Sequence, residues 1–252
     1  MDGMILAAGL GTRLQPLTDD IPKALVPVRG VPVLELVARR LITAGVDRLV
    51  INTHHHAEQI TAFVRGRDGF GVSVDFSHEA ERPMDTGGGI KRAAGLFRRD
   101  GPILVHNVDV LSGVDLSALV RVHRAAGALA TLAVRRPAGG RYVLVSGTGR
   151  FCGYGSRDGG QHVVVGCDDE TGLGRATFCG IQVLDPTFPE RITEDGVFSI
   201  IYVYARLAGS GEAVQTYDIG HAPWMDIGTH EDLAIANQLP PSGDLWPFSA
   251  AS

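Results

Sequence analysis

The stretch from Met4 to Val28, MILAAGLGTRLQPLTDDIPKALVPV, decides the fold prediction. It starts as a short apolar run that stops at glycine, which is the pattern of a buried strand. Gly9 and Gly11 end this strand, and two cations, Arg13 and Lys23, follow where a loop is expected. The first question is therefore what a glycine-rich loop with two cations holds at the end of a strand.

Strand-like and helix-like segments alternate through the first half of the chain. The predicted strands are Gly3–Ala8, Leu49–Asn52, Val72–Phe76, Ile103–Val108 and Ala130–Arg135. The predicted helices between them are Leu34–Ile42, Ala57–Val64, Ile90–Leu96 and Leu116–Ala126. Such alternation predicts an α/β fold, a Rossmann-like, mostly parallel sheet flanked by helices on both faces.

From about Pro137 the pattern changes to short β-rich pieces separated by glycines. Strands are predicted at Tyr142–Val145, Gln161–Val165 and Thr177–Leu184, as hairpins added to one side of the sheet. Helices are predicted at Ser199–Ala208 and from near Thr229. We expect one domain over 1–237, with a small β-rich insertion at about 137–185. A C-terminal tail follows at 238–252, and its Pro- and Ser-rich part from Pro240 is expected to be poorly ordered.

Composition limits the class of protein. The chain has 252 residues, 44% of them hydrophobic and 20% charged, with a net charge of -5, so nothing recommends nucleic acid as a partner. The N-terminal apolar run is too short for a signal segment or a membrane span, and a cytoplasmic protein without membrane contact is predicted. Three widely spaced cysteines, Cys152, Cys167 and Cys179, predict neither a disulfide framework nor a zinc site, and a reducing compartment is expected.

The first loop has the chemistry of an anion site. In a parallel sheet, ligands bind beyond the carboxyl ends of the strands, where Gly9 and Gly11 lie, and glycines let backbone N–H groups approach an anion. Arg13 can clamp phosphate oxygens and Lys23 can add a point charge, which together predict a triphosphate or pyrophosphate site. A Walker loop is absent, and Leu14 breaks the G-x-G-x-x-G fingerprint. An NAD-dependent reductase is therefore a disfavoured alternative. The chain also has no Tyr-x-x-x-Lys pair, which such a reductase would need.

The whole stretch resembles a more specific pattern. A-A-G-x-G-T-R-L-x-P-L-T followed by P-K-A-L-V-P-V is similar to the signature loop of the sugar-1-phosphate nucleotidyltransferases. The resemblance implies catalytic roles for Arg13 and Lys23. It implies nucleotide binding by Ala7, Ala8, Gly9, Gly11, Thr12, Arg13 and Lys23.

The resemblance also implies a magnesium site. Relatives place a metal-binding carboxylate after the fourth strand, where this chain has Asp109, although Val108 replaces the usual glycine. A second ligand is expected from a W-x-D-I/V-G-T segment, and Trp224–Thr229 supplies Asp226. Two carboxylates are hard-oxygen ligands suited to Mg²⁺ that bridges phosphates, so Mg²⁺ is the expected cofactor.

Two further segments bear on the substrates. The resemblance implies base recognition by a loop that carries Asp85, Thr86, Gly87 and Gly88, and D-T-G-G-G-I is most similar to the N-acetylmuramate-1-phosphate uridylyltransferases. Sugar contacts are expected from Asn107, Gly180 and Arg141. The E-K-P segment whose lysine holds the sugar phosphate in many relatives is missing, and Arg141 and Arg157 are candidate substitutes. The three histidines His54–His56 are expected to be structural or surface residues.

The resemblance implies transfer of a nucleotidyl group from a nucleoside triphosphate to a sugar 1-phosphate with release of pyrophosphate. UTP and N-acetylmuramate 1-phosphate are the predicted pair, and GTP with mannose 1-phosphate or a heptose 1-phosphate is the alternative. A non-catalytic nucleotide-sugar sensor on the same fold is an alternative of another class. These substrates are the expected partners, and a monomer or a homodimer is expected.

Overall fold

Four parallel strands form one half of the central sheet. The computed structural model describes residues 1–167 and 170–239. Its parallel strands lie in the order β5 (Ser73–His78), β4 (Arg48–Thr53), β1 (Asp2–Leu6) and β6 (Ile103–Asn107). Their carboxyl ends therefore meet at one edge of the sheet, where a ligand site is expected.

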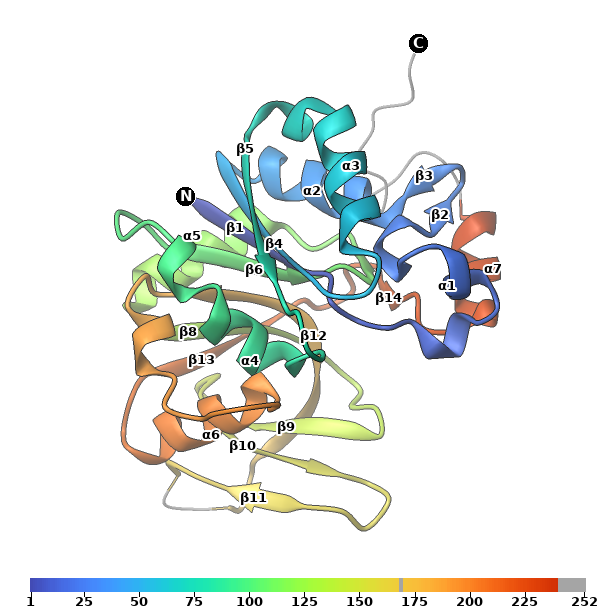
Figure 1. The fold of residues 1–252 in the computed structure, drawn as a ribbon. Helices are drawn as coiled ribbons and strands as arrows, with labels where there is room; N and C mark the ends of the chain where they lie inside the picture. The colour runs from blue at the N-terminus through green and yellow to red at the C-terminus, as the bar shows by residue number, and fades with distance from the viewer. Residues whose placement is uncertain (168–169, 240–252) are drawn as a thin grey trace.

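The other half of the sheet branches from one long strand, β12 (Gly174–Leu184), which runs antiparallel to β6. The second part of β12 also pairs with β8 (Ala130–Arg135), and β8 pairs in parallel with β13 (Val214–Asp218). The first part of β12 pairs with β9 (Arg141–Val145), β9 pairs with β10 (Phe151–Ser156), and β10 pairs with β11 (His162–Val164), each time antiparallel. The strands of the expected β-rich insertion thus extend the main sheet (Figure 1).

Helices cover both faces of the sheet (Figure 1). Side chains of a strand point alternately to opposite faces, and in β1 Ile5 packs into one core while Met4 and Leu6 pack into the other. The first core takes buried side chains from α2 (Val33–Thr43), α3 (Ala57–Gly66), α5 (Leu116–Ala126) and α7 (His230–Gln238). Two helices pack in the second core: α4 (Asp85–Arg92) and α6 (Ile200–Gly209).

Several shorter elements complete the fold. The strands are β2 (Pro27–Val28), β3 (Val31–Pro32), β7 (Val110–Ser112) and β14 (Trp224–Asp226), and the helices are α1 (Leu17–Asp20) and α7 (His230–Gln238). Single 3₁₀ turns lie at η1 (Thr12–Leu14), η2 (Lys23–Leu25), η3 (Asp68–Gly71), η4 (Ala94–Leu96) and η5 (Phe188–Arg191). Antiparallel pairing of β14 with β7 brings the late W-M-D segment beside the end of β6. Among the helices that the structure describes, none is long and apolar enough to cross a membrane.

The α/β class, the mostly parallel sheet and the helices on both faces are confirmed. The sequence did not predict β10, β13 or the β7–β14 pair. One local prediction is wrong: the segment from Asp85 to Gly89 is the first part of α4, whereas a loop was expected there. Of the expected tail at 238–252, residues from 240 onward lie outside the described part of the chain.

The expectation that no cysteines pair is also wrong. Cys152 on β10 forms a disulfide with Cys167, which follows β11, and Cys179 is free and buried. The hairpin explains this pairing, because Gly153 lies opposite Val164 and the Val165 amide donates to the Cys152 carbonyl at 3.0 Å. A separation of 15 residues carries no sequence signal without knowledge of that hairpin.

Candidate active site

A relay of buried hydrogen bonds connects the loop after β1 to the rest of the sheet. The Ala7 amide donates to Oδ1 of Asn52 at 2.6 Å, and Nδ2 of Asn52 donates to Oε1 of Glu79 at 2.6 Å. The other carboxylate oxygen of Glu79 accepts from the Met84 amide at 2.7 Å. The relay therefore fixes the loop relative to the start of α4. The sequence reasoning missed Asn52 and Glu79, although Asn52 lies near the end of β4 and Glu79 directly follows β5.

Glycine is required inside this loop. Gly11 has φ 68°, and a Cβ there would lie 2.9 Å from Cγ2 of Thr18 and 3.1 Å from Cβ of Lys23. Any side chain would displace the segment that carries Lys23. By contrast, a Cβ at Gly9 would meet nothing within 4 Å, so the backbone there is open to a ligand.

Lys23 and Asp109 meet at the carboxyl end of β6. Lys23 Nζ lies 2.6 Å from Oδ2 of Asp109, and the lysine is only 9% exposed. The position of Asp109 is fixed because its carbonyl accepts from the Ile227 amide at 2.7 Å. Val108, which stands where the resemblance implies glycine, is buried. It lines a cavity together with Lys23 and Asp109.

Asp226 lies on the strand next to Asp109. It is paired with Val110 across β14 and β7, and the two carboxylates interact electrostatically. Partial burial, followed by the charges of Asp232 and Asp109, raises the pKa of Asp226, while the charges of Arg13 and Lys23 act to lower it. Arg13, Lys23 and Asp109 thus lie near enough to act on Asp226, although these residues come from three distant parts of the chain.

These carboxylates are the candidate metal ligands. No group of three or more His, Cys, Asp or Glu side chains suited to a metal occurs among residues 1–167 and 170–239. Mg²⁺ commonly takes one or two protein carboxylates and completes its shell with water and substrate phosphates, so two carboxylates fit this ion. The ammonium group of Lys23 at Asp109 shows that a cation is accommodated at this carboxylate.

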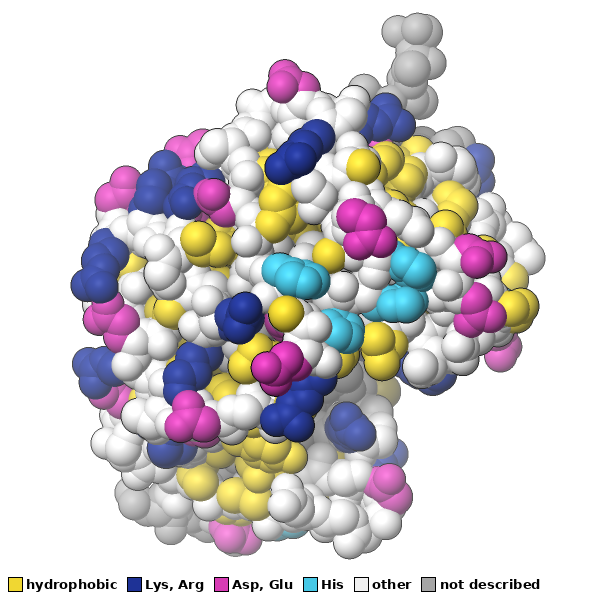
Figure 2. Space-filling model, in the orientation of Figure 1, with side chains coloured by type: hydrophobic (Ala, Val, Ile, Leu, Met, Phe, Trp, Pro, Cys, Tyr) yellow, Lys and Arg dark blue, Asp and Glu magenta, His cyan; other side chains and the backbone are white. Residues whose placement is uncertain are grey.

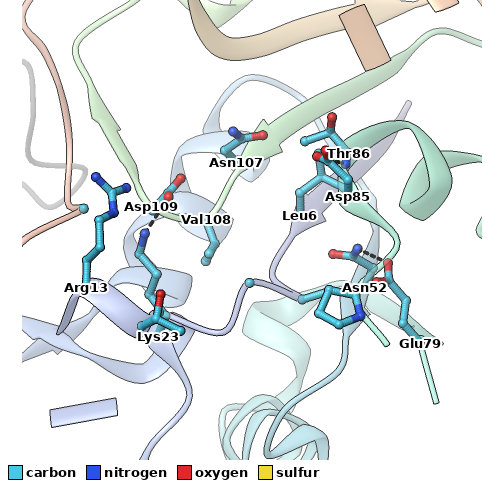
Figure 3. Close-up of a pocket in the computed structure, with 16 residues that line it drawn as sticks. Leu6, Arg13, Lys23, Asn52, Glu79, Asp85, Thr86, Asn107, Val108 and Asp109 are labelled. Atoms are coloured by element: carbon cyan, nitrogen blue, oxygen red, sulfur yellow. Dashed lines mark hydrogen bonds and ion pairs between the residues drawn. The ribbon is translucent and has the colours of Figure 1, made fainter. Parts of the chain in front are cut away.

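Two cavities share a border at this edge. The smaller, about 310 Å³, is lined by the first loop, Lys23, Asn52, Glu79 and Asp109, as Figure 3 shows. The larger, about 590 Å³, is lined by β9, β10, Phe178 and the start of α6. Asp85, Thr86 and Asn107 line both cavities. A ligand that spans the two would therefore pass these three side chains.

The structure brings most of the predicted site residues together. Of the predicted residues, the smaller cavity is lined by Ala8, Gly9, Gly11, Thr12, Arg13, Lys23, Asp85, Thr86, Asn107 and Asp109, and the larger by Asp85, Thr86, Asn107 and Arg141. Ala7, Gly87, Gly88, Gly180 and Asp226 lie next to these linings and outside them. Gly180 is packed against Asn107, because a Cβ there would lie 2.8 Å from Nδ2 of Asn107.

Gly87 and Gly88 have a packing role in α4. Both amides donate to the Phe198 carbonyl, at 3.0 and 3.4 Å, which leaves their backbone engaged within the protein. The adjacent side chain of Thr86 accepts from the Ile200 amide at 3.0 Å and ties α4 to α6. A direct contact of these glycine amides with a base stays a prediction.

The histidines that follow β4 form hydrogen bonds with backbone carbonyls of the protein itself. His54 Nδ1 pairs with the Glu79 carbonyl at 2.5 Å, and His56 Nε2 pairs with the Asp19 carbonyl at 3.0 Å. Figure 2 shows histidines gathered on one face, with acidic and basic side chains interspersed around them.

Burial raises the pKa of the Cys179 thiol to about 12, which makes it a poor nucleophile at neutral pH.

Comparison with known proteins shows the class to which this site belongs. The nucleotidyl transferase family model matches residues 2–141. The chain is 32% identical over 237 residues to N-acetylmuramate alpha-1-phosphate uridylyltransferase of Caulobacter vibrioides, covering 89% of this chain and 90% of the relative. The chain therefore belongs to the nucleotidyl transferase family and is an enzyme of the sugar-1-phosphate nucleotidyltransferase type.

Three further proteins are similar to this chain in sequence or in fold. The chain is 30% identical over 235 residues to mannose-1-phosphate guanylyltransferase of Mycobacterium tuberculosis, covering 92% of this chain and 62% of that relative. HddC of Yersinia pseudotuberculosis, solved in complex with GMP-PN, shares the fold with a TM-score of 0.70 and 24% identity, covering 94% of this chain and 98% of that structure. A putative glucose-1-phosphate thymidylyltransferase of Bacillus anthracis shares it with a TM-score of 0.76 and 18% identity, covering 97% and 98%.

Proposed function

We propose that this enzyme transfers the uridylyl group of UTP to N-acetylmuramate 1-phosphate and releases pyrophosphate. The convergence of Arg13, Lys23, Asp109 and Asp226 at the carboxyl edge of the sheet supports the reaction. The similarity to the Caulobacter vibrioides relative over nearly the whole chain supports this choice of substrates.

The chain supplies electrostatics and alignment for this reaction. A phosphate monoester has a second pKa near 6, so the attacking sugar phosphate is largely ionised at neutral pH and needs no general base. What the reaction needs is suppression of repulsion between two polyanions, together with in-line geometry. In the proposal, Arg13 and the amides of the first loop bind the departing pyrophosphate. Lys23 leaves its carboxylate partner to bind phosphate oxygens at the reacting centre.

Asp109 and Asp226 would hold Mg²⁺, which supplies charge neutralisation between the two phosphate groups when bound. Asp226 ends β14 and Asp109 directly precedes β7, so the antiparallel pairing of these two strands brings the carboxylates to the same edge. Burial, followed by the charges of Asp232 and Asp109, raises the pKa of Asp226, so a cation bound beside it would favour its ionised form.

The second candidate reaction is transfer from GTP to mannose 1-phosphate or a heptose 1-phosphate. The identity of 30% to the Mycobacterium tuberculosis relative across 92% of this chain supports it. A non-catalytic sensor is disfavoured, because the four residues expected to act in catalysis and metal binding, Arg13, Lys23, Asp109 and Asp226, are all present.

The test is pyrophosphate release in the presence of Mg²⁺, with each of four nucleoside triphosphates against a panel of sugar 1-phosphates. The panel contains N-acetylmuramate, N-acetylglucosamine, mannose and glucose 1-phosphates, and Asp109→Asn serves as the blank. Faster release with UTP and N-acetylmuramate 1-phosphate than with any other pair is the expected result. Release with GTP and mannose 1-phosphate would establish the second candidate, and binding of a nucleotide sugar without any release would establish a sensor.

A further inference from the structure

One positively charged side chain lines the larger cavity. Its walls include Tyr142, Tyr154, Ser156, Gln161 and Tyr202, which offer hydroxyl groups, an amide and aromatic faces. Arg141 and Asp85 are the charged side chains in its lining, and Asp85 lies at the border with the smaller cavity. Away from that border, the charge that a ligand meets is therefore positive.

The backbone that carries Arg141 is fixed on both sides. Arg141 is the first residue of β9 and lies opposite Ser156 on β10. The Arg157 amide donates to the Gly140 carbonyl at 2.9 Å, and the Gly139 amide donates to Oγ1 of Thr177 at 2.7 Å. The backbone at the start of β9, which carries the Arg141 side chain, is therefore held in place.

Arg141 forms no ion pair with any residue in the part of the chain that the structure describes. By contrast, Arg206 bonds Glu194 at 2.7 Å and Arg48 bonds Asp75 at 2.6 Å. Asp158 interacts with Arg141 at longer range, but its carboxylate accepts a hydrogen bond from the Ser156 hydroxyl. The guanidinium group keeps its five donors for a ligand in the cavity.

Arg141 also lies away from the reacting centre. Lys23 and Asp109 line the smaller cavity, whereas Arg141 lines only the larger cavity. The sugar phosphate must meet Lys23 and Asp109 in the proposed reaction, so the group that reaches Arg141 is a substituent on the remote part of the sugar.

We propose that Arg141 binds a carboxylate on that substituent and thereby selects acidic sugar 1-phosphates over neutral ones. This inference rests on the proposed function. A guanidinium group binds a carboxylate through two parallel hydrogen bonds, which gives both charge and geometric selectivity. N-acetylmuramate carries a lactyl ether that ends in a carboxylate, whereas N-acetylglucosamine has the same ring and acetamido group without it. Arg141 is therefore a specificity-determining residue.

The experiment compares Arg141→Gln with the wild-type enzyme on N-acetylmuramate 1-phosphate and N-acetylglucosamine 1-phosphate, with UTP and GTP tested in parallel. A hydrogen bond to a charged group contributes about 1.5–3 kcal/mol, so kcat/KM for the acidic sugar should fall roughly 10- to 100-fold, mostly through KM. Turnover of the neutral sugar should stay within about twofold, since it makes no such contact. Arg65→Gln is the control for the loss of an exposed arginine, because Arg65 lies on α3 outside the linings of both cavities, and turnover of both sugars should stay unchanged.

The possible outcomes separate the two proposals. Equal loss on both sugars, or no loss on the acidic sugar, would overturn the role of Arg141 while leaving the reaction intact. Absence of pyrophosphate release with every pair would refute the proposed function. In that case, calorimetric titration with N-acetylmuramate 1-phosphate still tests the carboxylate contact: weaker binding to Arg141→Gln supports it, and unchanged binding overturns it.

Discussion

At the scale of single residues, the Lys23–Asp109 pair is the most informative contact in the protein. The two side chains come from η2 and from the end of β6, and their distance of 2.6 Å makes each the nearest counterion of the other. Both were predicted as functional from the sequence. Their pairing was not, because it depends on how the segment after the first loop folds back over β6.

Lys23→Ala and Asp109→Asn should each lower turnover while the fold survives. Removal of one preorganised electrostatic contact costs about 3–4 kcal/mol of barrier, so kcat should fall about 10²–10³-fold in each variant. Steady-state pyrophosphate release measures this, and far-ultraviolet circular dichroism checks the fold. Near-wild-type turnover in either variant would contradict the assigned role.

Gly180 is a second residue at which backbone and site are linked. Its φ is 70°, it lies in the register shift of β12 between Phe178 and Gln182, and a Cβ there would overlap Nδ2 of Asn107. Gly180→Ala should therefore cost about 1–2 kcal/mol of stability, since a non-glycine residue is strained in this region. It should also raise KM for the sugar 1-phosphate by moving Asn107.

Urea unfolding and sugar titration measure the two effects of Gly180→Ala. Gly101→Ala is the control, because Gly101 has no positive φ and an added Cβ there would meet nothing within 4 Å. If both variants unfolded at the same urea concentration, the strain argued for Gly180 would be absent.

At the scale of elements, α4 shows where sequence reasoning fails. Three consecutive glycines, Gly87–Gly89, have poor helix propensity, so a loop was predicted. They are helical because tertiary packing demands small residues: added Cβ atoms at Gly87 and Gly88 would lie 2.4 Å from Cε2 of Phe198 and 2.8 Å from the Gly196 carbonyl oxygen. Packing against the segment before α6 thus overrides propensity.

Gly88→Ala should destabilise the protein although alanine is the better helix former. Propensity alone would favour alanine by about 1 kcal/mol, but overpacking against backbone typically costs about 1–3 kcal/mol. Gly95→Ala in η4 is the matched control, since nothing lies within 4 Å of an added Cβ there. Urea unfolding of the two variants decides, and a more stable Gly88→Ala would show that α4 can move away from Gly196.

The predictable elements share a strong local pattern. The parallel strands and α2, α3 and α5 follow from apolar periodicity, and the first loop follows from its glycines and cations. The strand β10, with sequence FCGYGS, and the strand β13, with sequence VQTYD, carry too few consecutive apolar residues to be predicted. Their pairing comes from neighbours in space, as does the disulfide that joins β10 to the residue after β11.

At the scale of the whole molecule, two buried histidines link stability to pH. Burial is the main cause that lowers the pKa of His106 and of His123 to about 4, from the ordinary 6.5. The folded state therefore keeps both neutral where the unfolded chain binds protons. Stability contributed by their neutral forms is complete above pH 6.5 and is lost as the pH falls from 6.5 toward 4.

The free energy of unfolding should therefore fall between pH 6.5 and pH 4, by about 3 kcal/mol from His106 alone. Urea unfolding at several pH values measures the slope. His106→Gln should flatten it, His123→Gln is the second variant in case the first does not fold, and exposed His55→Gln is the control. Unchanged slopes in both buried-site variants would contradict this account.

The central claim, attack of a sugar phosphate on the α-phosphorus at this site, is tested most directly with isotopically labelled UTP. The enzyme is incubated with N-acetylmuramate 1-phosphate, Mg²⁺ and UTP that carries its label in the α-phosphate, and the products are separated. The account predicts that all transferred label appears in the nucleotide sugar and none in the released pyrophosphate. Label found in pyrophosphate or inorganic phosphate, or release of pyrophosphate without a labelled sugar product, would contradict it.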